Sequence, residues 1–383
     1  MSMIVPIGPQ HPALKEVENF TLEVKGEEVV GVDVRLGYSH RGVERGMQER
    51  SYAQGVYLSE RVCGICNVVH SATYCQGVEK LAGVEIPERA KAIRTILLEL
   101  ERIHSHFLWA GVAFYEIGFE TLFMYTWRDR ETVLDVREAI SGARQISSSN
   151  VPGGVRRDVR AEHISFALES LRKLEEAAKS YVDVCNSDPT IIARCSGVGV
   201  LSKKDAMRLC ATGPTTRASG VEWDVRKEDP YLMYGDVDFD VITEEDGDVL
   251  AKILVRLREV LESIKITRQL LKELPGGPVR VDFPKKIEPS EAVTRTEAPR
   301  GELLYHFISN GTEKPERVRI RTPTYANVPS WGPMLTGATI ADVPIIIASI
   351  DPCFTCCDRV SIIDVERGER RTAGFQELRR WRR

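Results

Sequence analysis

The sequence predicts an α+β fold that is mainly α, with a central bundle of long helices, an N-terminal β-hairpin or sheet and a mixed C-terminal region. Two observations predict this fold. Apolar residues recur at steps of three and four over several long stretches, which gives each predicted helix one apolar face. Shorter runs with strand character occur near the start of the chain and again after about residue 278.

Residues 18–36 predict the N-terminal hairpin. Apolar and polar side chains alternate there on both sides of Gly26, as expected for two strands joined by a tight turn. The apolar positions of the two runs are Phe20, Leu22, Val24, Val30, Val32 and Val34.

Pro87 begins the first long helical stretch, because proline is favoured at the start of a helix. Its apolar positions are Ala90, Ile93, Ile96, Leu97, Leu100, Ile103 and Phe107. Similar periodicity at about 119–144, 157–184 and 244–274 predicts further helices that pack with it as a bundle. From about residue 278 the chain is richer in proline and glycine, with strand-like runs such as residues 318–321.

Composition indicates a well-packed protein that does not itself cross a membrane. The 383 residues are 43% hydrophobic and 28% charged, with a net charge of -4. We find no apolar run of about 18 residues and no signal-peptide pattern before Pro6, so we expect no membrane span. The nine cysteines, an odd number, favour a reducing cytosol over a disulfide framework.

Two cysteine pairs near opposite ends of the chain carry most of the functional information. Cys63 and Cys66 lie in Arg-Val-Cys-Gly-Ile-Cys, and Cys353 and Cys356 lie in Asp-Pro-Cys-Phe-Thr-Cys. Each pair places two thiolates within reach of one metal, so the folded chain can assemble a four-sulfur site. One interpretation is a structural zinc site that joins the two ends. We expect the other cysteines to be small buried or incidental residues, namely Cys75, Cys185, Cys195, Cys210 and Cys357.

These motifs resemble those of the catalytic large subunit of nickel-iron hydrogenases. That family has an Arg-x-Cys-Gly-x-Cys segment followed by a histidine, here His70, and an Asp-Pro-Cys-x-x-Cys segment. A third family motif, Glu-Ala-Pro-Arg-Gly, occupies residues 297–301, with His306 after it. The resemblance extends from Gly8 to about Arg359, nearly the whole chain.

Three further segments narrow the resemblance. Residues 8–12, 40–44 and 150–158 are similar to segments shared by respiratory complex I and the energy-converting, membrane-bound hydrogenases. The homologous subunit of complex I, which forms its quinone site, lacks the four cysteines. The chain therefore resembles the large subunit of an Ech, Eha, Ehb or formate-hydrogenlyase type enzyme.

The resemblance implies a nickel-iron centre whose iron carries carbon monoxide and two cyanides. Cys63 and Cys353 would be terminal nickel ligands, and Cys66 and Cys356 would bridge nickel and iron. Hydrogen would be split heterolytically, with Cys353 as the expected base for the proton and Arg300 as its rival.

The resemblance also implies roles for residues around the metals. Arg300 would hydrogen-bond one cyanide, Thr324 would serve another, and His70 would donate to a bridging sulfur. Glu16 matches a glutamate beside the nickel in the membrane-bound relatives, which would carry protons. Glu44 is the other candidate proton carrier and matches a glutamate that is tied to a bound magnesium. Standard hydrogenases have histidine where this chain has Arg359, which weakens the transfer of that magnesium ligand.

The implied function is catalysis of reversible hydrogen oxidation and proton reduction within a membrane-bound, energy-converting complex. The implied partners are an iron-sulfur small subunit, membrane-integral antiporter-like subunits, ferredoxin and a maturation protease, with no nucleic acid. The complex would lie on the cytoplasmic side of the cell membrane. Residues 1–359 would form one compact unit, and residues 360–383 would be removed after nickel insertion. The alternative is a complex I-like scaffold subunit that holds a structural metal or none.

Overall fold

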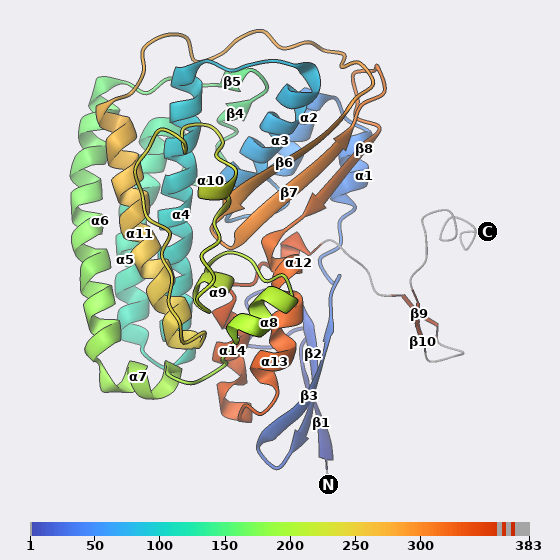
Figure 1. The fold of residues 1–383 in the computed structure, drawn as a ribbon, viewed down its shortest axis with the longest axis vertical. Coiled ribbons are helices and arrows are strands. Elements are labelled where there is room, and N and C mark those ends of the chain that lie inside the picture. Colours follow the sequence, from blue (N-terminus) through green and yellow to red (C-terminus); the bar gives the residue numbers. More distant parts are fainter. Residues whose placement is uncertain (1, 358–361, 365–368, 372–383) are drawn as a thin grey trace.

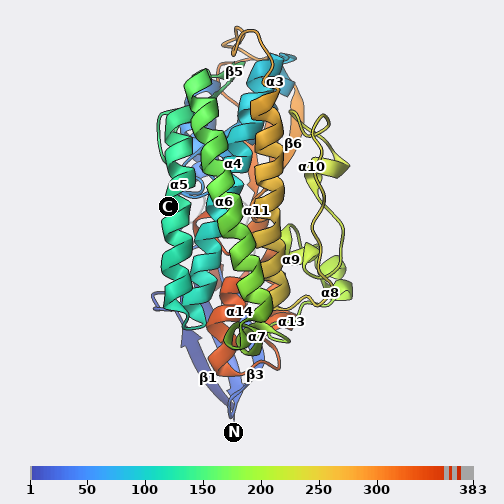
Figure 2. The same ribbon diagram turned by 90° about the vertical axis from the view of Figure 1, so that its left-hand side faces the viewer.

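Four long helices form one side of the protein. The computed structural model describes residues 2–357, 362–364 and 369–371. In it, α4 packs against α5 and α11, and α6 packs against α5 and α11, as an upright bundle (Figures 1 and 2). The four helices are α4 (Glu88–Glu116), α5 (Glu120–Ser141), α6 (Ala161–Ser187) and α11 (Val249–Lys272). The predicted bundle is confirmed, and Pro87 immediately precedes α4 as expected.

A three-stranded antiparallel sheet in the order β1-β2-β3 forms the N-terminal end of the fold. Its strands are β1 (Ser2–Ile7), β2 (Asn19–Lys25) and β3 (Glu28–Arg35). The pair β2–β3 is the predicted hairpin, and its turn contains Gly26, whose φ is +67°. Strand β1, which pairs with β2 from Ser2 opposite Lys25 to Ile7 opposite Phe20, was not predicted.

A second antiparallel sheet, in the order β6-β7-β8, lies beside the bundle. Its strands are β6 (Glu291–Ala298), β7 (Gly301–Ile308) and β8 (Arg317–Arg321). The predicted strand at 318–321 is β8. The motif at 297–301 forms the tight connection between β6 and β7, so this hairpin presents Arg300 at its tip.

Shorter elements connect these layers. Helices α1 (Val43–Gln48), α2 (Tyr52–Ser59) and α3 (Asn67–Ala82) precede the bundle, and β4 (Asn150–Val151) pairs with β5 (Gly154–Val155). After α6 come α7 (Pro189–Cys195), α8 (Lys203–Arg208), α9 (Pro214–Arg217) and α10 (Val225–Glu228). After β8 come α12 (Pro323–Asn327), η1 (Val328–Ser330), α13 (Trp331–Leu335), η2 (Ile340–Asp342), α14 (Val343–Ser349) and η3 (Phe354–Cys356). A last antiparallel pair is β9 (Ile362–Asp364) with β10 (Glu369–Arg371).

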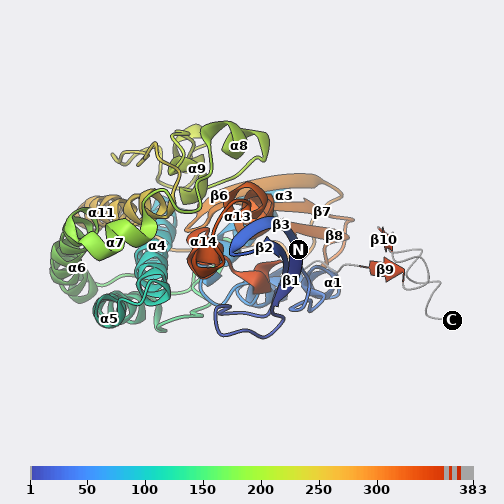
Figure 3. The ribbon, with the colours of Figure 1, turned by 90° about the horizontal axis from the view of Figure 1, so that it is seen from below.

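Two hydrophobic cores meet beside the second cysteine pair. The larger core joins the bundle to α3 and the β6–β8 sheet and includes Cys353 and Cys356. The smaller core lies under β2 with α13 and α14, and Figure 3 shows α14 next to α4 when the molecule is seen from below. Phe354 belongs to this smaller core, where its ring lies 5.8 Å from that of Trp331 and 6.2 Å from that of Phe20.

No helix among the described residues is long and apolar enough to cross a membrane.

Candidate metal centre

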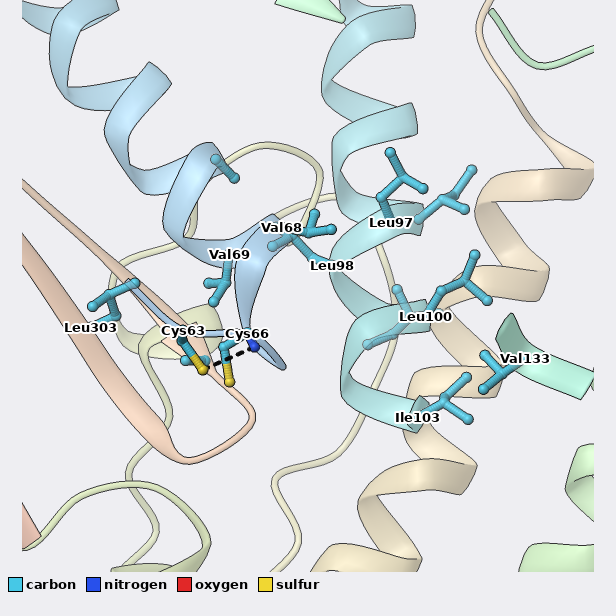
Figure 4. Packing of buried hydrophobic residues seen from close by; sticks show 14 of the residues in the cluster. Cys63, Cys66, Val68, Val69, Leu97, Leu98, Leu100, Ile103, Val133 and Leu303 are labelled. Carbon is cyan, nitrogen blue, oxygen red and sulfur yellow. Dashed lines mark hydrogen bonds between the residues drawn. The ribbon is translucent and has the colours of Figure 1, made fainter. Parts of the chain in front are cut away.

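The first cysteine pair lies in the turn between α2 and α3. Cys66 occupies the position just before α3, and its backbone N–H donates to the Cys63 Sγ over 3.1 Å (Figure 4). The carboxylate of Glu101, which projects from α4, accepts the backbone N–H groups of Val68 at 2.6 Å and Val69 at 2.9 Å. These N–H groups belong to the first turn of α3, where no intrahelical partner exists, so Glu101 caps this helix from a neighbouring one.

The second cysteine pair follows α14. Asp351 has a positive φ of 56°, which redirects the chain from α14 toward the first pair. Cys353 comes next, and Cys356 ends the single turn η3. The Cys353 N–H donates to the Thr324 Oγ1 over 3.0 Å, and the Thr322 hydroxyl donates to the Cys356 carbonyl over 3.2 Å. The N-terminal end of α12 therefore holds the backbone of the second pair in place.

The structure brings the two pairs together. The Sγ atoms of Cys63 and Cys353 are 3.3 Å apart, and those of Cys353 and Cys356 are 2.8 Å apart. The ligand atoms of these three residues all lie within 4.8 Å of one another, and all four cysteines are buried. Three of the four predicted sulfurs are thus brought together from segments that are 290 positions apart in the sequence, and their role as metal ligands stays a prediction.

Burial and mutual contact make the four thiols electrostatically unequal. Hydrogen bonds from Cys353, Cys356 and Cys66 lower the pKa of Cys63 well below its usual range. The contact with Cys63, followed by burial, raises the pKa of Cys66, and burial raises that of Cys356. Four sulfurs this close cannot all carry a negative charge without a cation among them, because like charges at this range repel strongly.

Arg300 is the buried cation at this site. Its Nη1 donates to the Cys66 Sγ at 2.9 Å and to the Ser105 hydroxyl at 3.1 Å. Its Nη2 donates to the Asp351 Oδ1 and its Nε to the Asp351 carbonyl, each at 2.7 Å. The guanidinium therefore contacts both cysteine segments from the interior.

The position of Arg300 depends on two glycines that touch each other. Gly301 has a φ of +123° and Gly213 a φ of +70°, and both conformations favour glycine. A Cβ on Gly213 would lie 2.4 Å from the Gly301 Cα, so the two backbones approach too closely for any side chain. Residues 212–213 therefore support the tip of the β6–β7 hairpin that carries Arg300.

Thr324 and His70, both predicted to surround the metals, are buried near the sulfurs. The Thr324 hydroxyl oxygen already accepts the Cys353 N–H. The His70 Nδ1 lies 2.8 Å from the Tyr305 hydroxyl, and burial lowers the pKa of His70 to about 4, although the charge of Cys63 opposes this. The hydrogen bond seen for His70 thus leads to β7, and its predicted donation to a bridging sulfur stays a prediction.

Glu16 lies where the sequence predicted it, beside the second cysteine pair. Its Oε1 is 4.0 Å from the Cys353 Sγ and accepts from the Thr355 hydroxyl at 2.9 Å, while its Oε2 accepts the Thr355 N–H at 2.8 Å. A cavity of about 180 Å³ adjoins the site. Its polar lining includes Glu16, Arg300, Asp351 and Glu116, and most of the rest is apolar.

Glu44 lies on α1 and contacts β8 rather than the sulfurs. Its Oε2 pairs with Arg317 at 3.0 Å, and its Oε1 accepts the Ile320 N–H at 3.0 Å. It is not among the residues whose ligand atoms cluster with the cysteines in the described part of the chain. Its proposed role as a magnesium ligand or proton carrier remains a prediction.

Sequence reasoning did not identify several residues that contact or support the site. Ser105 and Glu101 lie on α4, whose side chains are buried on most sides. A carboxylate in a helix that is otherwise buried was the sequence signal that could have identified Glu101 as a residue with a specific partner. Asp351 was noted only as part of its motif. Glu18 is fully buried, and neither carboxylate oxygen has a hydrogen-bond partner among the described residues. Arg359 and the predicted cleavage point lie outside the described residues.

The donor set fits a soft transition metal. Thiolates are preferred ligands of nickel, iron and zinc, and the clustered sulfurs are excess negative charge that a metal dication would neutralise. A structural zinc site is usually closed on all sides. Here a cavity lies beside the cysteine segments, lined by the buried guanidinium of Arg300 and the carboxylate of Glu16, which suits a site that admits a small reactant.

Comparison with known proteins identifies the family. Residues 116–291 and 284–359 match the family described as respiratory-chain NADH dehydrogenase, 49 Kd subunit, and residues 41–151 match nickel-dependent hydrogenase. The carbon monoxide-induced hydrogenase of Rhodospirillum rubrum is 40% identical, over 93% of this chain and 99% of that protein. The chain belongs to the family that unites energy-converting hydrogenase large subunits with their counterparts in complex I.

Members of this family are named for different reactions. The membrane-bound hydrogenase subunit alpha of Pyrococcus furiosus is 41% identical, over 94% of this chain and 88% of that protein. A subunit of the NADH-quinone oxidoreductase of Koribacter versatilis is 34% identical, over 94% and 96% of the two chains. A chain from the membrane-bound sulfane sulfur reductase, an archaeal respiratory membrane complex, aligns with a TM-score of 0.89 at 34% identity, over 94% and 98%. Membership therefore establishes an oxidoreductase family, and the choice of reaction depends on the site.

Proposed function

We propose that this chain is the catalytic subunit of an energy-converting nickel-iron hydrogenase. The observation that carries the proposal is the buried cluster of the Cys63, Cys353 and Cys356 sulfurs. Arg300 hydrogen-bonds the neighbouring Cys66 sulfur and also lines the adjoining cavity. The four cysteines are the feature that the homologous complex I subunit lacks. Their convergence supports hydrogen chemistry rather than quinone chemistry.

Cys63, Cys66, Cys353 and Cys356 would hold nickel and an iron that carries carbon monoxide and cyanide. When bound, this group supplies reversible heterolytic splitting of hydrogen and exchange of electrons. Arg300 holds a positive charge against the Cys66 sulfur and orients Asp351, while the apolar walls of the cavity exclude bulk water. Thr324 fixes the backbone of Cys353. Cys353 is the proposed proton acceptor, with Arg300 as the rival.

Protons need a route away from the buried sulfurs. The Glu16 Oε1 is the nearest carboxylate oxygen seen at Cys353, and the Thr355 hydroxyl lies 3.2 Å from the same sulfur and donates to Glu16. These contacts support the proposal that Glu16 receives a proton from Cys353, directly or through Thr355. The proposed partners are an iron-sulfur small subunit, ferredoxin and membrane-integral antiporter-like subunits, at the cytoplasmic side of the membrane. We also propose that a maturation protease removes residues 360–383.

The test is metal analysis and infrared spectroscopy of the complex purified with its native partners. We expect about one nickel per chain and infrared bands of metal-bound carbon monoxide and cyanide. Cys63→Ser and Cys356→Ser should abolish metal retention and hydrogen turnover, because a hydroxyl is a hard and poorly coordinating replacement for a thiolate. Cys210→Ser, which removes an exposed cysteine, is the matched control and should leave both intact.

A second candidate function is a complex I-like subunit without a nickel centre. Relatives named as subunits of NADH-quinone oxidoreductase, at 34–36% identity over 93–94% of the chain, favour it. Zinc or no metal at the cysteines, with no infrared bands, would support this candidate and overturn the hydrogenase proposal.

A further inference from the structure

Arg41 bridges the two cysteine segments from the solvent side. Its side chain is exposed, yet its Nη1 donates to the Arg61 carbonyl at 2.8 Å and its Nη2 to the Val62 carbonyl at 3.0 Å. The same Nη2 also donates to the Thr355 carbonyl at 2.9 Å. Arg61 and Val62 immediately precede Cys63, and Thr355 lies between Cys353 and Cys356, so one guanidinium contacts the backbone of both segments.

This contact is the counterpart of the buried one made by Arg300. Arg300 joins the Cys66 sulfur to Asp351 with a side chain that is 3% exposed, whereas Arg41 joins backbone carbonyls at the surface. The two bridges lie on the buried and exposed sides of the sulfurs. Together they constrain both the separation and the tilt of the two segments, which a single bridge would leave free to rotate.

The chemistry of the contact requires arginine. Three carbonyl oxygens in different directions need several N–H donors in a fixed plane, which a guanidinium provides and a single ammonium does not. The Arg61 and Val62 carbonyls also lie just beyond the C-terminal end of α2, where the helix dipole favours a positive charge.

We propose that Arg41 is a positioning residue that sets the distance between Cys63 and Cys353. No contact of Arg41 with a sulfur is needed, because it acts through the backbone on either side of the sulfurs. The inference deepens the proposed function, since the site it shapes is the proposed metal centre. Its central test uses metal-free protein, so it can fail or succeed independently of nickel.

The test is disulfide mapping in the full chain purified from nickel-depleted cells. Two equivalents of ferricyanide remove two electrons from a pair of thiols, which lose two protons and form one disulfide. Peptide mass spectrometry then gives the ratio of the bond between Cys63 and Cys353 to that between Cys353 and Cys356. We expect Arg41→Gln to lower this ratio several-fold, and Arg41→Lys to give an intermediate value.

Arg50→Gln is the matched control. Arg50 is also an exposed arginine near this segment, but it donates to the Gly46 carbonyl within its own helical turn. The Arg50→Gln variant should have the wild-type disulfide ratio. An unchanged ratio in Arg41→Gln would overturn the inference, as would an equal fall in Arg50→Gln. If Arg41→Gln does not accumulate as folded protein, a wild-type ratio in Arg41→Lys would overturn it as well.

A second readout uses the metal-loaded complex. In Arg41→Gln, nickel should leave faster in the presence of a chelator, and the carbon monoxide and cyanide bands should broaden or shift, because the ligand geometry is less fixed. Wild-type release rates and bands would count against a positioning role. Wild-type protein that lacks nickel and infrared bands would refute the proposed function while leaving the disulfide ratio as a valid test of Arg41.

Discussion

Arg300 shows how one side chain can serve both charge and geometry at this centre. It is buried, and its three nitrogens contact a sulfur, a hydroxyl, a carboxylate and a carbonyl. A cation in a dry site lowers the free energy of the surrounding thiolates, and the planar fork keeps Asp351 in a single orientation. The same fork faces the cavity, so the residue is positioned to act on whatever occupies it.

Replacing Arg300 with lysine should separate these two contributions. Arg300→Lys keeps the charge but cannot reach Cys66 and Asp351 together, so we expect the metals to be retained and hydrogen turnover to fall by about 10²–10³-fold. The measurement is steady-state hydrogen turnover alongside nickel content. Turnover equal to wild type would assign Arg300 to packing alone.

Glu18 is a buried carboxylate. The free-energy cost of burying its charged form should make the stability of the protein depend on pH. Burial is the largest cause of a rise in the pKa of Glu18 from 4.5 to about 8; the Asn19 backbone N–H opposes this rise and the charge of Glu16 adds to it. Below pH 4.5 the side chain is protonated in both the folded and unfolded chain. Between pH 4.5 and 8 the unfolded chain releases this proton and the folded chain keeps it, so stability falls as the pH rises.

Glu18→Gln should therefore flatten the pH dependence of stability. The loss of unfolding free energy between pH 5 and pH 8 should shrink by about 1–3 kcal/mol relative to wild type. Chemical denaturation at the two pH values measures it. Glu23→Gln, exposed on strand β2 that follows Glu18, is the control and should follow wild type. Parallel behaviour of Glu18→Gln and wild type would show that Glu18 is solvated or paired.

At the scale of the element, α3 connects the metal centre to the core. Its first residues follow Cys66, its N-terminal amides are capped by Glu101, and its length packs against β6 and β7. Burial raises the pKa of Glu101 to about 7, although Arg137 and the two amides favour its charged form. The helix start, and with it Cys66, therefore depends on a carboxylate from another helix.

Removing that cap should destabilise the protein and loosen the first cysteine pair. Glu101→Ala leaves two buried N–H groups without an acceptor, which costs about 2–4 kcal/mol of unfolding free energy. Glu88→Ala, at an exposed site on the same helix, should cost less than about 1 kcal/mol. Denaturant midpoints of the three proteins test this. Equal losses of unfolding free energy in both variants would mean that the Glu101 cap does not stabilise the start of α3.

Patterns of apolar residues predicted the elements that pack on one face, such as the hairpin of residues 19–35 and the four long helices. They did not predict β1, which pairs with β2 through backbone hydrogen bonds and exposes Met3 and Ile4. Motif spacing predicted a four-sulfur metal site, of which the structure brings the Cys63, Cys353 and Cys356 sulfurs together, while the metal-binding role stays a prediction. It could not predict that Glu101 or Arg41 supports them, because these contacts are made to backbone groups of segments distant in sequence.

At the scale of the whole molecule, the metal centre ties the first part of the chain to the last. The two cysteine segments belong to one core, while Phe354 between Cys353 and Cys356 anchors the second core. A metal held by all four sulfurs would bind the folded chain and not the unfolded one. Its binding free energy would then add to the stability of both cores together.

Metal removal should accordingly lower the melting temperature of the whole chain rather than release one segment. Protein from nickel-depleted cells should melt roughly 3–4 °C below nickel-loaded protein, as expected for a ligand at about a hundredfold above its dissociation constant and a chain of this length. Differential scanning calorimetry measures both forms. Identical melting temperatures would indicate that the sulfurs are held in place by the protein alone.

Because the two cysteine pairs are far apart along the chain, the ribosome synthesises the first pair well before the second. Synthesis proceeds at about 5–20 residues per second, so the 290 positions between Cys63 and Cys353 take roughly 15–60 s to translate. During that interval Cys63 and Cys66 exist without their partners, as a dithiol open to stray metals and oxidants. For the proposed metal centre to form, a cell that makes this protein must therefore keep the first cysteine pair reduced and free of metal until the ribosome has delivered the second pair.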